Sequence, residues 1–393
     1  MTILLISTIH RHAPPEACSG YLYIVNPDSD QVLRQIPGIE PPFREADLNP
    51  RGGMRGLRGI SLYGGEIAIA NYSSIACFDR QWDLTKILTN PVCAGIHDIS
   101  LEADGVWASS SANDLLLKLD FQGNITDYYS LRDQRKLLRS LQMDPGSLNS
   151  SALSGRIDFR DRSNFNTETY DHLHINSFAQ TPDGGLLISL GWIVNRQFGF
   201  LLMLKAWFIR IRLWDHVISF NRKLRVLLGV QKQMLTELIV RPVRGKSALL
   251  RFTRRGKAEI MLSFHEAFVP SHSVFILKNG MAIYLYTTRG EVIHFDPKNG
   301  RVLSKTHVTE EFLRGVAELG NDLLVLGAGT DLLFFNLLEH RVVKQIHLSD
   351  MKPEAIFSIQ TLPPEFELPP INLAEKVGKI SGYYGNKVVF SRD

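Results

Sequence analysis

Six polar residues that stand at the head of six similar segments are the best candidates for chemistry in this chain. Each is followed by three or four apolar or small residues, then a Gly, Asp or Asn turn and a second apolar run. The six residues are Arg58, His97, His174, His272, Arg314 and Glu354. If the segments are equivalent strands around one axis, these side chains form a ring of three histidines, two arginines and one glutamate.

The three histidines could hold a divalent metal ion as a cofactor. Neutral imidazoles are ligands of Zn, Fe, Mn and Cu, and a carboxylate such as Glu354 could join them. Catalytic metal sites commonly use three protein ligands and leave one position open. On this interpretation the metal ligands are His97, His174 and His272.

Residues beside the ring could assist it. His172 precedes His174 by two residues, so in a strand it would point to the same face. Asp98 and Asp171 adjoin ring histidines and could orient their imidazoles. Strand alternation, however, predicts that the side chain of Asp98 turns away from the face that His97 occupies.

The same ring could instead recognise an anion. Arg58 and Arg314 supply fixed positive charge, and the guanidinium group binds carboxylate, sulfate or phosphate with two parallel hydrogen bonds. His172 and Asn176 would then contact the substrate. His97, His174 and His272 would be the catalytic acid, base or nucleophile near neutral pH, with Glu354 as a further base.

A purely structural ring is the alternative to both. The channel of a propeller contains water, and polar residues on its inner strands often bind only water and neighbouring backbone. An Arg-Gly pair at the start of a strand, as at Arg58 and Arg314, can also serve packing and capping alone.

The elements that must position the ring follow from the repeat. The leading residues are 39, 77, 98, 42 and 40 residues apart, and a period near 40 with strand-length apolar runs is typical of β-propeller blades. Asp, Asn and Gly turns separate the later strands of several copies. We therefore predict an all-β fold, a six-bladed β-propeller of four-stranded antiparallel blades. A β-sandwich or two unrelated β domains is the alternative.

The two ends of the chain are predicted to close the ring together. The last copy, 354–360, contains one clear strand before a Pro-rich tail, whereas residues 3–8, 20–26 and 31–36 form three strand-like runs. One strand from the C-terminal region and three from the N-terminus make a sixth blade, which removes the exposed sheet edge. The whole chain, 1–393, is then a single domain.

The two long spacings predict insertions. The first, 133–171, begins like a helix, becomes polar and is interpreted as a lid-like loop or as a solvated surface loop. The second, 192–246, is interpreted as a basic amphipathic helical segment. It mixes aromatic and basic residues, among them Trp207, Phe208, Arg210, Arg212 and Trp214.

Charge is concentrated in the same region. Residues 196–255 contain 14 Lys and Arg against two acids, a net +12, so the remainder carries −8 of the overall +4. This segment is predicted to meet an anionic membrane surface or a protein partner, by lying on the surface, because no stretch reaches the ~20 apolar residues that span a bilayer. Nucleic acid is a less suitable partner, because no nucleic-acid-binding module is evident.

Cysteine usage and the first residues bear on location. Cys18, Cys77 and Cys93 show no metal-ligand spacing and cannot all pair, which favours a reducing compartment. Residues 1–7 are interpreted as a strand, because they lack the basic start of a signal peptide. The expected location is the cytoplasm, with peripheral attachment to a membrane. No phosphate-binding loop, nucleophile elbow or Cys-x-x-Cys pair occurs in a suitable context.

A local resemblance to one family appears in the third copy. Residues 174–178, His-Ile-Asn-Ser-Phe, are followed by the Asp-Gly turn and apolar-Ser strand of 182–189. This strand pair resembles that of arylsulfotransferase-like propellers, and the resemblance implies that His174 takes up a sulfuryl group. The disulfide and signal peptide of that family's periplasmic members are absent. More generally, the chain is similar to six-bladed propellers of the strictosidine-synthase and NHL-repeat kind.

Two functions remain open at this point. The first is an enzyme that acts on a small anionic metabolite in a His- and Arg-lined channel, with or without a metal ion, while attached peripherally to a membrane. The alternative is a non-catalytic propeller that serves as an interaction platform docked through its basic insertion.

Overall fold

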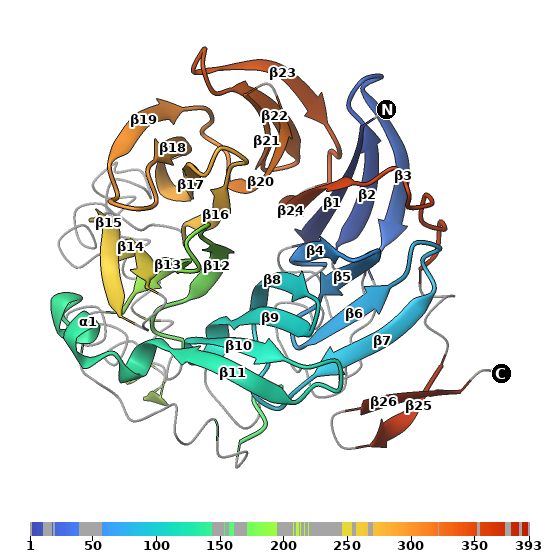
Figure 1. The fold of residues 1–393 in the computed structure, drawn as a ribbon, viewed down its shortest axis with the longest axis horizontal. Coiled ribbons are helices and arrows are strands. Elements are labelled where there is room, and N and C mark those ends of the chain that lie inside the picture. Colours follow the sequence, from blue (N-terminus) through green and yellow to red (C-terminus); the bar gives the residue numbers. More distant parts are fainter. Residues whose placement is uncertain are drawn as a thin grey trace.

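The strands of the computed structural model form six four-stranded antiparallel blades around one channel, which confirms the predicted β-propeller (Figure 1). One of the six sheets gains two further strands at its outer edge. The structure describes residues 2–10, 18, 20, 21–38, 57–143, 153, 157–160, 171–194, 207, 210, 211, 213, 216, 219, 246–253, 257–265, 270–320, 322–351, 354–373, 379–384 and 387–391.

Each blade contributes one strand to every radial layer. The inner strands are β4 (Ile60–Tyr63), β8 (Ile96–Glu102), β12 (Ile175–Gln180), β16 (His272–Ile276), β20 (Leu313–Gly320) and β24 (Glu354–Leu362). The second strands are β5 (Glu66–Ala70), β9 (Gly105–Ser110), β13 (Leu186–Ile193), β17 (Ala282–Tyr286), β21 (Leu323–Ala328) and β1 (Ile3–His10). Every inner strand contacts the inner strands of both neighbouring blades, so the ring is continuous.

The two outer layers follow the same order. The third strands are β6 (Ser74–Phe78), β10 (Leu115–Leu119), β14 (Lys246–Phe252), β18 (Glu291–Phe295), β22 (Asp331–Asn336) and β2 (Tyr21–Asn26). The outer strands are β7 (Leu84–Thr89), β11 (Ile125–Ser130), β15 (Ala258–Phe264), β19 (Val302–His307), β23 (Arg341–His347) and β3 (Gln31–Pro37). Short helices are η1 (Ser111–Asn113), η2 (Leu131–Asp133), α1 (Arg135–Ser140) and η5 (Thr287–Arg289).

The ring closes with strands from both ends of the chain, as predicted. β24 pairs with β1 along its length, and β2 and β3 complete that sheet (Figure 1). A C-terminal hairpin that the sequence analysis did not predict, β25 (Lys379–Tyr384) and β26 (Lys387–Ser391), adds to the outer strand β7 through one residue pair, Lys387 with Leu88.

The apolar core lies between the blades. Second and third strands are buried on both faces and are almost continuously apolar, whereas β19 and β23 alternate between half-buried and exposed residues. Six of the seven apolar clusters in the described part of the chain each fill the space between one pair of neighbouring blades. Burial of these faces drives the blades together around the channel.

Short polar turns join third strands to outer strands. In five blades the side-chain oxygen of an Asp or Asn accepts backbone N–H groups two to four residues further on. The residues are Asn26, Asp79, Asp120, Asp296 and Asn336. These bonds replace the backbone turn and explain why the same residue types recur there.

Serine and aspartate side chains tie neighbouring inner strands together. Ser61 Oγ accepts a hydrogen bond from Leu101 N of the next blade at 2.9 Å. Ser177 and Ser273 do the same for Val274 N and Gly315 N, at 2.9 and 3.0 Å. Asp98 Oδ2 accepts from Phe178 N at 3.2 Å. The inner strands of neighbouring blades are therefore linked by side-chain-to-backbone bonds in addition to apolar packing.

Both insertions lie largely outside the described residues. The first contains α1, whose Leu137 and Leu138 are buried in the core between two blades. The second falls between β13 and β14, in the blade that His174 begins. There Trp207 and Arg210 are helical and exposed. The predicted roles of 133–171 as a lid and of 192–246 as a docking segment remain predictions.

Candidate functional site

Each inner strand carries a bulge at or just after its ring residue. The pairing of inner and second strands shifts between Ile96 and Ile99, and equivalent shifts occur in β12, β16 and β20. In β24 the shift lies opposite Ser7 and Thr8. Before β4, Arg58 N and Gly59 O both bond to Ala70. A bulge places two residues against one, so it redirects side chains away from simple alternation.

His97 is a buried imidazole held in one tautomer. Its Nδ1 lies 2.7 Å from the carbonyl oxygen of Gly95, so Nδ1 carries the hydrogen and Nε2 keeps its lone pair. Burial lowers the pKa of His97 well below its ordinary value. The charges of Arg58, His174 and Arg314 lower this pKa further, so His97 is neutral at physiological pH.

His174 stands against His97 and is oriented by a carboxylate. The two ring centroids are 4.9 Å apart at an interplanar angle of 72°. His174 Nδ1 lies 2.7 Å from Asp171 Oδ2, an arrangement that fixes the orientation of the ring. This bond leaves Nε2 of His174 available for proton transfer. His174 also adopts a left-handed backbone conformation, with φ +48°.

A buried carboxylate from the preceding blade secures that backbone. Asp114 Oδ1 accepts hydrogen bonds from Leu173 N at 2.8 Å and His174 N at 3.3 Å, and Oδ2 accepts from His172 N at 3.2 Å. Arg132 Nε donates to Oδ2 at 2.8 Å. Burial raises the pKa of Asp114, and Arg132 opposes that shift. Asp114 thus acts on His174 by positioning its backbone.

Arg58 and Arg314 flank His97 and share one aromatic ring. Arg314 Cζ lies 3.1 Å from the ring centroid of Phe357, and Arg58 Cζ lies 5.7 Å from it. Arg58 also donates to Ile96 O at 2.5 Å, and its Nη1 is 3.5 Å from His97 Nδ1. Both arginines are buried, so their charges are weakly screened.

His272 is the third histidine of the group. Its ring centroid is 6.4 Å from that of His97 in a stacked arrangement. Its backbone N donates to Thr287 Oγ1 at 3.1 Å, and Thr287 in turn donates to Leu313 O. The structure therefore brings together the three histidines, from three consecutive blades.

The side chain of Glu354 contacts residues of its own blade. Thr8 Oγ1 donates to Glu354 Oε1 at 2.5 Å, Tyr23 Oη donates to Oε2 at 3.1 Å, and His10 Nε2 lies 3.6 Å from Oε2. Burial disfavours its ionisation, but the hydrogen bonds from His10 and Thr8 outweigh burial and lower the pKa of Glu354. This carboxylate binds β1 and β2, and it is not among the residues that line the pocket described next.

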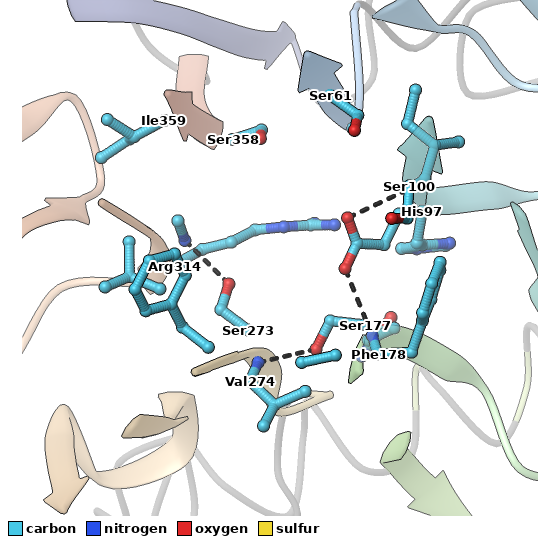
Figure 2. Close-up of a pocket in the computed structure, with 18 of the residues that line it drawn as sticks. Ser61, His97, Ser100, Ser177, Phe178, Ser273, Val274, Arg314, Ser358 and Ile359 are labelled. Carbon is cyan, nitrogen blue, oxygen red and sulfur yellow. Dashed lines mark hydrogen bonds between the residues drawn. The ribbon is translucent and has the colours of Figure 1, made fainter. Parts of the chain in front are cut away.

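A cavity of about 290 Å³ occupies the channel beside the ring. Its wall runs from His97 and Arg314 at the starts of inner strands to Gln180 and Gln360 near the ends of others. Figure 2 shows Arg314 extended across this pocket toward His97 and Ser100. A cavity of this size accommodates a small metabolite.

Asp98 also lines the pocket, contrary to the expectation from strand alternation. The bulge between Ile96 and Ile99 lets both His97 and Asp98 reach it. Asp98 Oδ1 accepts from Ile99 N at 3.0 Å, and Oδ2 accepts from Phe178 N. Burial raises the pKa of Asp98 to about 7, against the opposing effect of these N–H groups and of Arg314.

The remaining predicted residues take different places. Asn176 lines the pocket, and its Nδ2 donates to Ser271 O at 2.6 Å. His172 does not line it, and its carbonyl oxygen accepts from Val194 N. Phe208, Arg212 and Trp214 lie outside the described residues.

The predicted metal centre stays a prediction. Within the described ranges, no group of three His, Cys, Asp or Glu side chains is placed to hold an ion. Nδ1 of His97 and Nδ1 of His174 face Gly95 O and Asp171, so Nε2 is the atom of each ring that could serve as a ligand.

The sequence analysis missed three participants. Asp114 and Arg132 carry no pattern that links them to His174, because they lie in the preceding blade. Phe357 sits three residues after Glu354, in the run that was assigned only to the apolar strand. The sequence did indicate Asp98, because it directly follows the ring residue His97. Its place in the pocket depends on the bulge between Ile96 and Ile99, which strand alternation does not predict.

Comparison with known proteins shows the fold alone. No protein-family model matches the chain, and no curated protein does. A protein of unknown function from Bacteroides caccae is 11% identical with a TM-score of 0.51, over 92% of this chain and 98% of that one. A chain in a nidogen/laminin complex is 9% identical with a TM-score of 0.51, and the match covers 92% of this chain and 98% of that one. Virginiamycin B lyase from Staphylococcus aureus is 10% identical with a TM-score of 0.42, and the match covers 75% of this chain and 71% of that one. The chain is therefore a six-bladed β-propeller similar in fold, though not closely in sequence, to other solved proteins.

Proposed function

We propose that the protein is an enzyme that performs acid–base chemistry on a small anionic molecule in its channel. The observation that carries the proposal is the pair of contacting imidazoles, His97 and His174, whose Nδ1 atoms both face acceptors. Each therefore offers Nε2 for chemistry, and their surroundings differ. Two titratable groups with opposed environments in one site are typical of an acid and a base.

The two histidines would take different roles. His97, which is neutral, accepts a proton from the substrate at Nε2. His174, whose Nδ1 is held by Asp171, delivers a proton to the substrate from Nε2. Arg58 and Arg314 stabilise the negative charge of the substrate. This scheme uses four of the six residues of the predicted ring. It gives no step to His272, and Glu354 is bound to its own blade.

Turnover of natural metabolites tests the proposal without a known substrate. Purified protein is incubated with a small-molecule cell extract, and the extract is followed over time by mass spectrometry. We expect at least one anionic metabolite to be consumed by the parent protein and left intact by His97→Gln and by His174→Gln. His307→Gln is the matched control, because His307 is exposed on the outer strand β19. Equal consumption by parent and both variants, or no consumption at all, would contradict an acid–base role.

Docking through the basic insertion is the second candidate. Trp207, Ile211 and Leu213 are 54, 38 and 42% exposed, and Arg210 beside them is exposed as well. Ile211 N donates to Trp207 O, which places both on one helical turn. Exposed apolar and basic side chains on one turn suit an anionic lipid surface. No helix in the described part of the chain is long and apolar enough to cross a membrane.

Vesicle flotation tests this second candidate. We expect the protein to float with vesicles that contain phosphatidylserine and not with phosphatidylcholine vesicles. Trp207→Ala and Arg210→Glu should each reduce the floating fraction, whereas Arg341→Glu, on the outer strand β23, should not. Failure to float with either kind of vesicle would remove a lipid surface as the partner.

A further inference from the structure

Five serines from five different blades surround the channel pocket. Ser61, Ser100, Ser177, Ser273 and Ser358 all line it. Figure 2 shows these five residues arranged around the extended side chain of Arg314. They come from β4, β8, β12, β16 and β24, while the sixth inner strand supplies Arg314 itself.

Three of these hydroxyls are held in place by the backbone. The oxygens of Ser61, Ser177 and Ser273 accept N–H bonds from the next inner strand at 2.9–3.0 Å. A serine hydroxyl that accepts such a bond still has its own proton to donate. The fold therefore fixes the three oxygen positions and leaves their O–H groups free to turn toward the pocket.

The hydroxyl groups of Ser100 and Ser358 do not link neighbouring inner strands. For Ser100 and Ser358, the described part of the chain provides no hydrogen-bond partner for the side chain. Both side chains line the cavity and are only partly buried. Their hydroxyls are thus available to a molecule in the pocket, and they contribute nothing visible to the links between blades.

Positive charge completes a donor-rich wall. Arg314 is buried, and stacking on Phe357 at 3.1 Å holds its guanidinium group in the channel. Among the described residues that line the pocket, the carboxyl group is that of Asp98. Its two oxygens accept N–H bonds from Ile99 and Phe178, and it also interacts electrostatically with Arg314. Hydroxyl and guanidinium donors that converge on one point are what a bound oxyanion requires.

The geometry points to this pocket as the seat of an oxyanion: a carboxylate, phosphate or sulfate group of the substrate, bound by Arg314 and the serine hydroxyls. The inference deepens the proposed function, on which it rests, because it assigns the anionic end of the substrate to the serine-lined half of the channel. The reacting end then faces His97, which borders the same pocket.

Binding of simple oxyanions tests the inference without any turnover. Inorganic phosphate, sulfate and acetate are titrated separately into the full-length protein, and binding is followed by isothermal titration calorimetry and by NMR. We expect one site for at least one of the three, and the order of affinity tells phosphate, sulfate and carboxylate groups apart. No binding of any of the three at concentrations in the millimolar range would overturn the inference.

Variants assign the binding to the pocket. The double variant Ser100→Ala/Ser358→Ala should bind at least about tenfold more weakly, because two hydrogen bonds to an anion are lost. No side-chain link between blades is removed within the described part of the chain. Arg314→Met should bind more weakly still. The matched controls Ser304→Ala and Arg341→Met, on the outer strands β19 and β23, should bind like the parent. Unchanged affinity in both pocket variants would place the anion elsewhere and overturn the inference.

The histidine variants separate this inference from the proposed chemistry. His174→Gln does not alter the pocket wall, so oxyanion binding should persist in it. Binding that persists together with absent turnover in the parent would sustain the oxyanion site and remove the acid–base proposal. Turnover that persists without oxyanion binding, or in the Ser100→Ala/Ser358→Ala variant at the parent's KM, would overturn the oxyanion site alone.

Discussion

Asp98 is a partly buried carboxyl group on the pocket wall, and its ionisation opposes folding. Its pKa is raised from 3.8 to about 7, chiefly because burial removes water from the charged form. The N–H groups of Ile99 and Phe178 and the charge of Arg314 lower the pKa of Asp98, but by less than burial raises it. Below its unfolded-state pKa the group costs nothing, and the cost grows as pH rises toward its folded-state pKa.

Replacing Asp98 by Asn should therefore change how stability depends on pH. Because the raised pKa means that the folded state holds the proton more tightly, the parent should lose free energy of unfolding relative to Asp98→Asn as pH rises from about 4 to about 8, by up to about 4 kcal/mol. Urea unfolding at a series of pH values measures the difference. A difference that is constant with pH would show that Asp98 titrates normally. Asp183→Asn, on an exposed turn, is the control.

Asp114 is expected to contribute both to stability and to the position of His174. Asp114→Ala should lower the free energy of unfolding by about 3–5 kcal/mol, because Arg132 is left buried without its carboxylate. The same change frees the backbone of residues 172–174. Nitrogen-15 NMR of the imidazoles should then show that His174 loses its single Nδ1–H tautomer, while His97 keeps its own.

Two further variants separate positioning from stability. Ser110→Ala removes a buried hydroxyl bonded to Val92 and Ala94 in the same blade, so it should destabilise the fold without changing the His174 signals. Asp114→Ala/Arg132→Met should recover stability without restoring the tautomer. Unchanged His174 signals in Asp114→Ala would leave Asp114 with a role in stability only.

The inner strands depend on side-chain links as well as on packing. Ser177→Ala removes the acceptor of Val274 N between two blades, and an unpaired buried N–H costs about 1–3 kcal/mol. Ser358→Ala removes a hydroxyl that bonds to no described residue, so it should leave the free energy of unfolding nearly unchanged. Urea unfolding of both variants checks the contrast. Equal losses would mean that the links between blades contribute little.

Strand identity was accessible to sequence reasoning because it repeats, whereas strand irregularity was not. Three of the five spacings between leading residues are near 40, and Asx turns such as those at Asp120 and Asn336 recur in most blades. One interpretation could therefore be checked several times. The bulges that bring Asp98 to the pocket depend on pairing with a second strand, which no single segment encodes. The bond from Asp114 to the backbone at His174 crosses between blades and was equally invisible.

At the scale of the whole molecule, the ring has one seam. It lies between the paired strands β24 and β1, which join residues 354–362 to residues 3–10. Truncation after residue 348 should remove β24, expose apolar residues of β1 such as Leu4 and Ile6, and abolish a single cooperative unfolding transition.

A shorter truncation provides the control. Ending the chain after residue 373 removes the β25–β26 hairpin but keeps Phe366 and Leu373, which are buried in the core beside β1. This variant should unfold in one transition, as the parent does. Calorimetry distinguishes the two, and a cooperative transition in the shorter chain that lacks β24 would show that the seam is dispensable.

The seam also sets the order of events during synthesis on the ribosome. β1, β2 and β3 emerge first, yet the strand that covers the inner edge of β1 is encoded more than 340 residues later. Five blades can pair locally as they are made, but the blade begun earliest is the last to be completed. Until then it presents an unpaired apolar edge, which is the type of surface that chaperones and other nascent chains bind. The step that completes the channel, and with it the pocket wall that Ser358 supplies, must therefore wait until β24 has been synthesised.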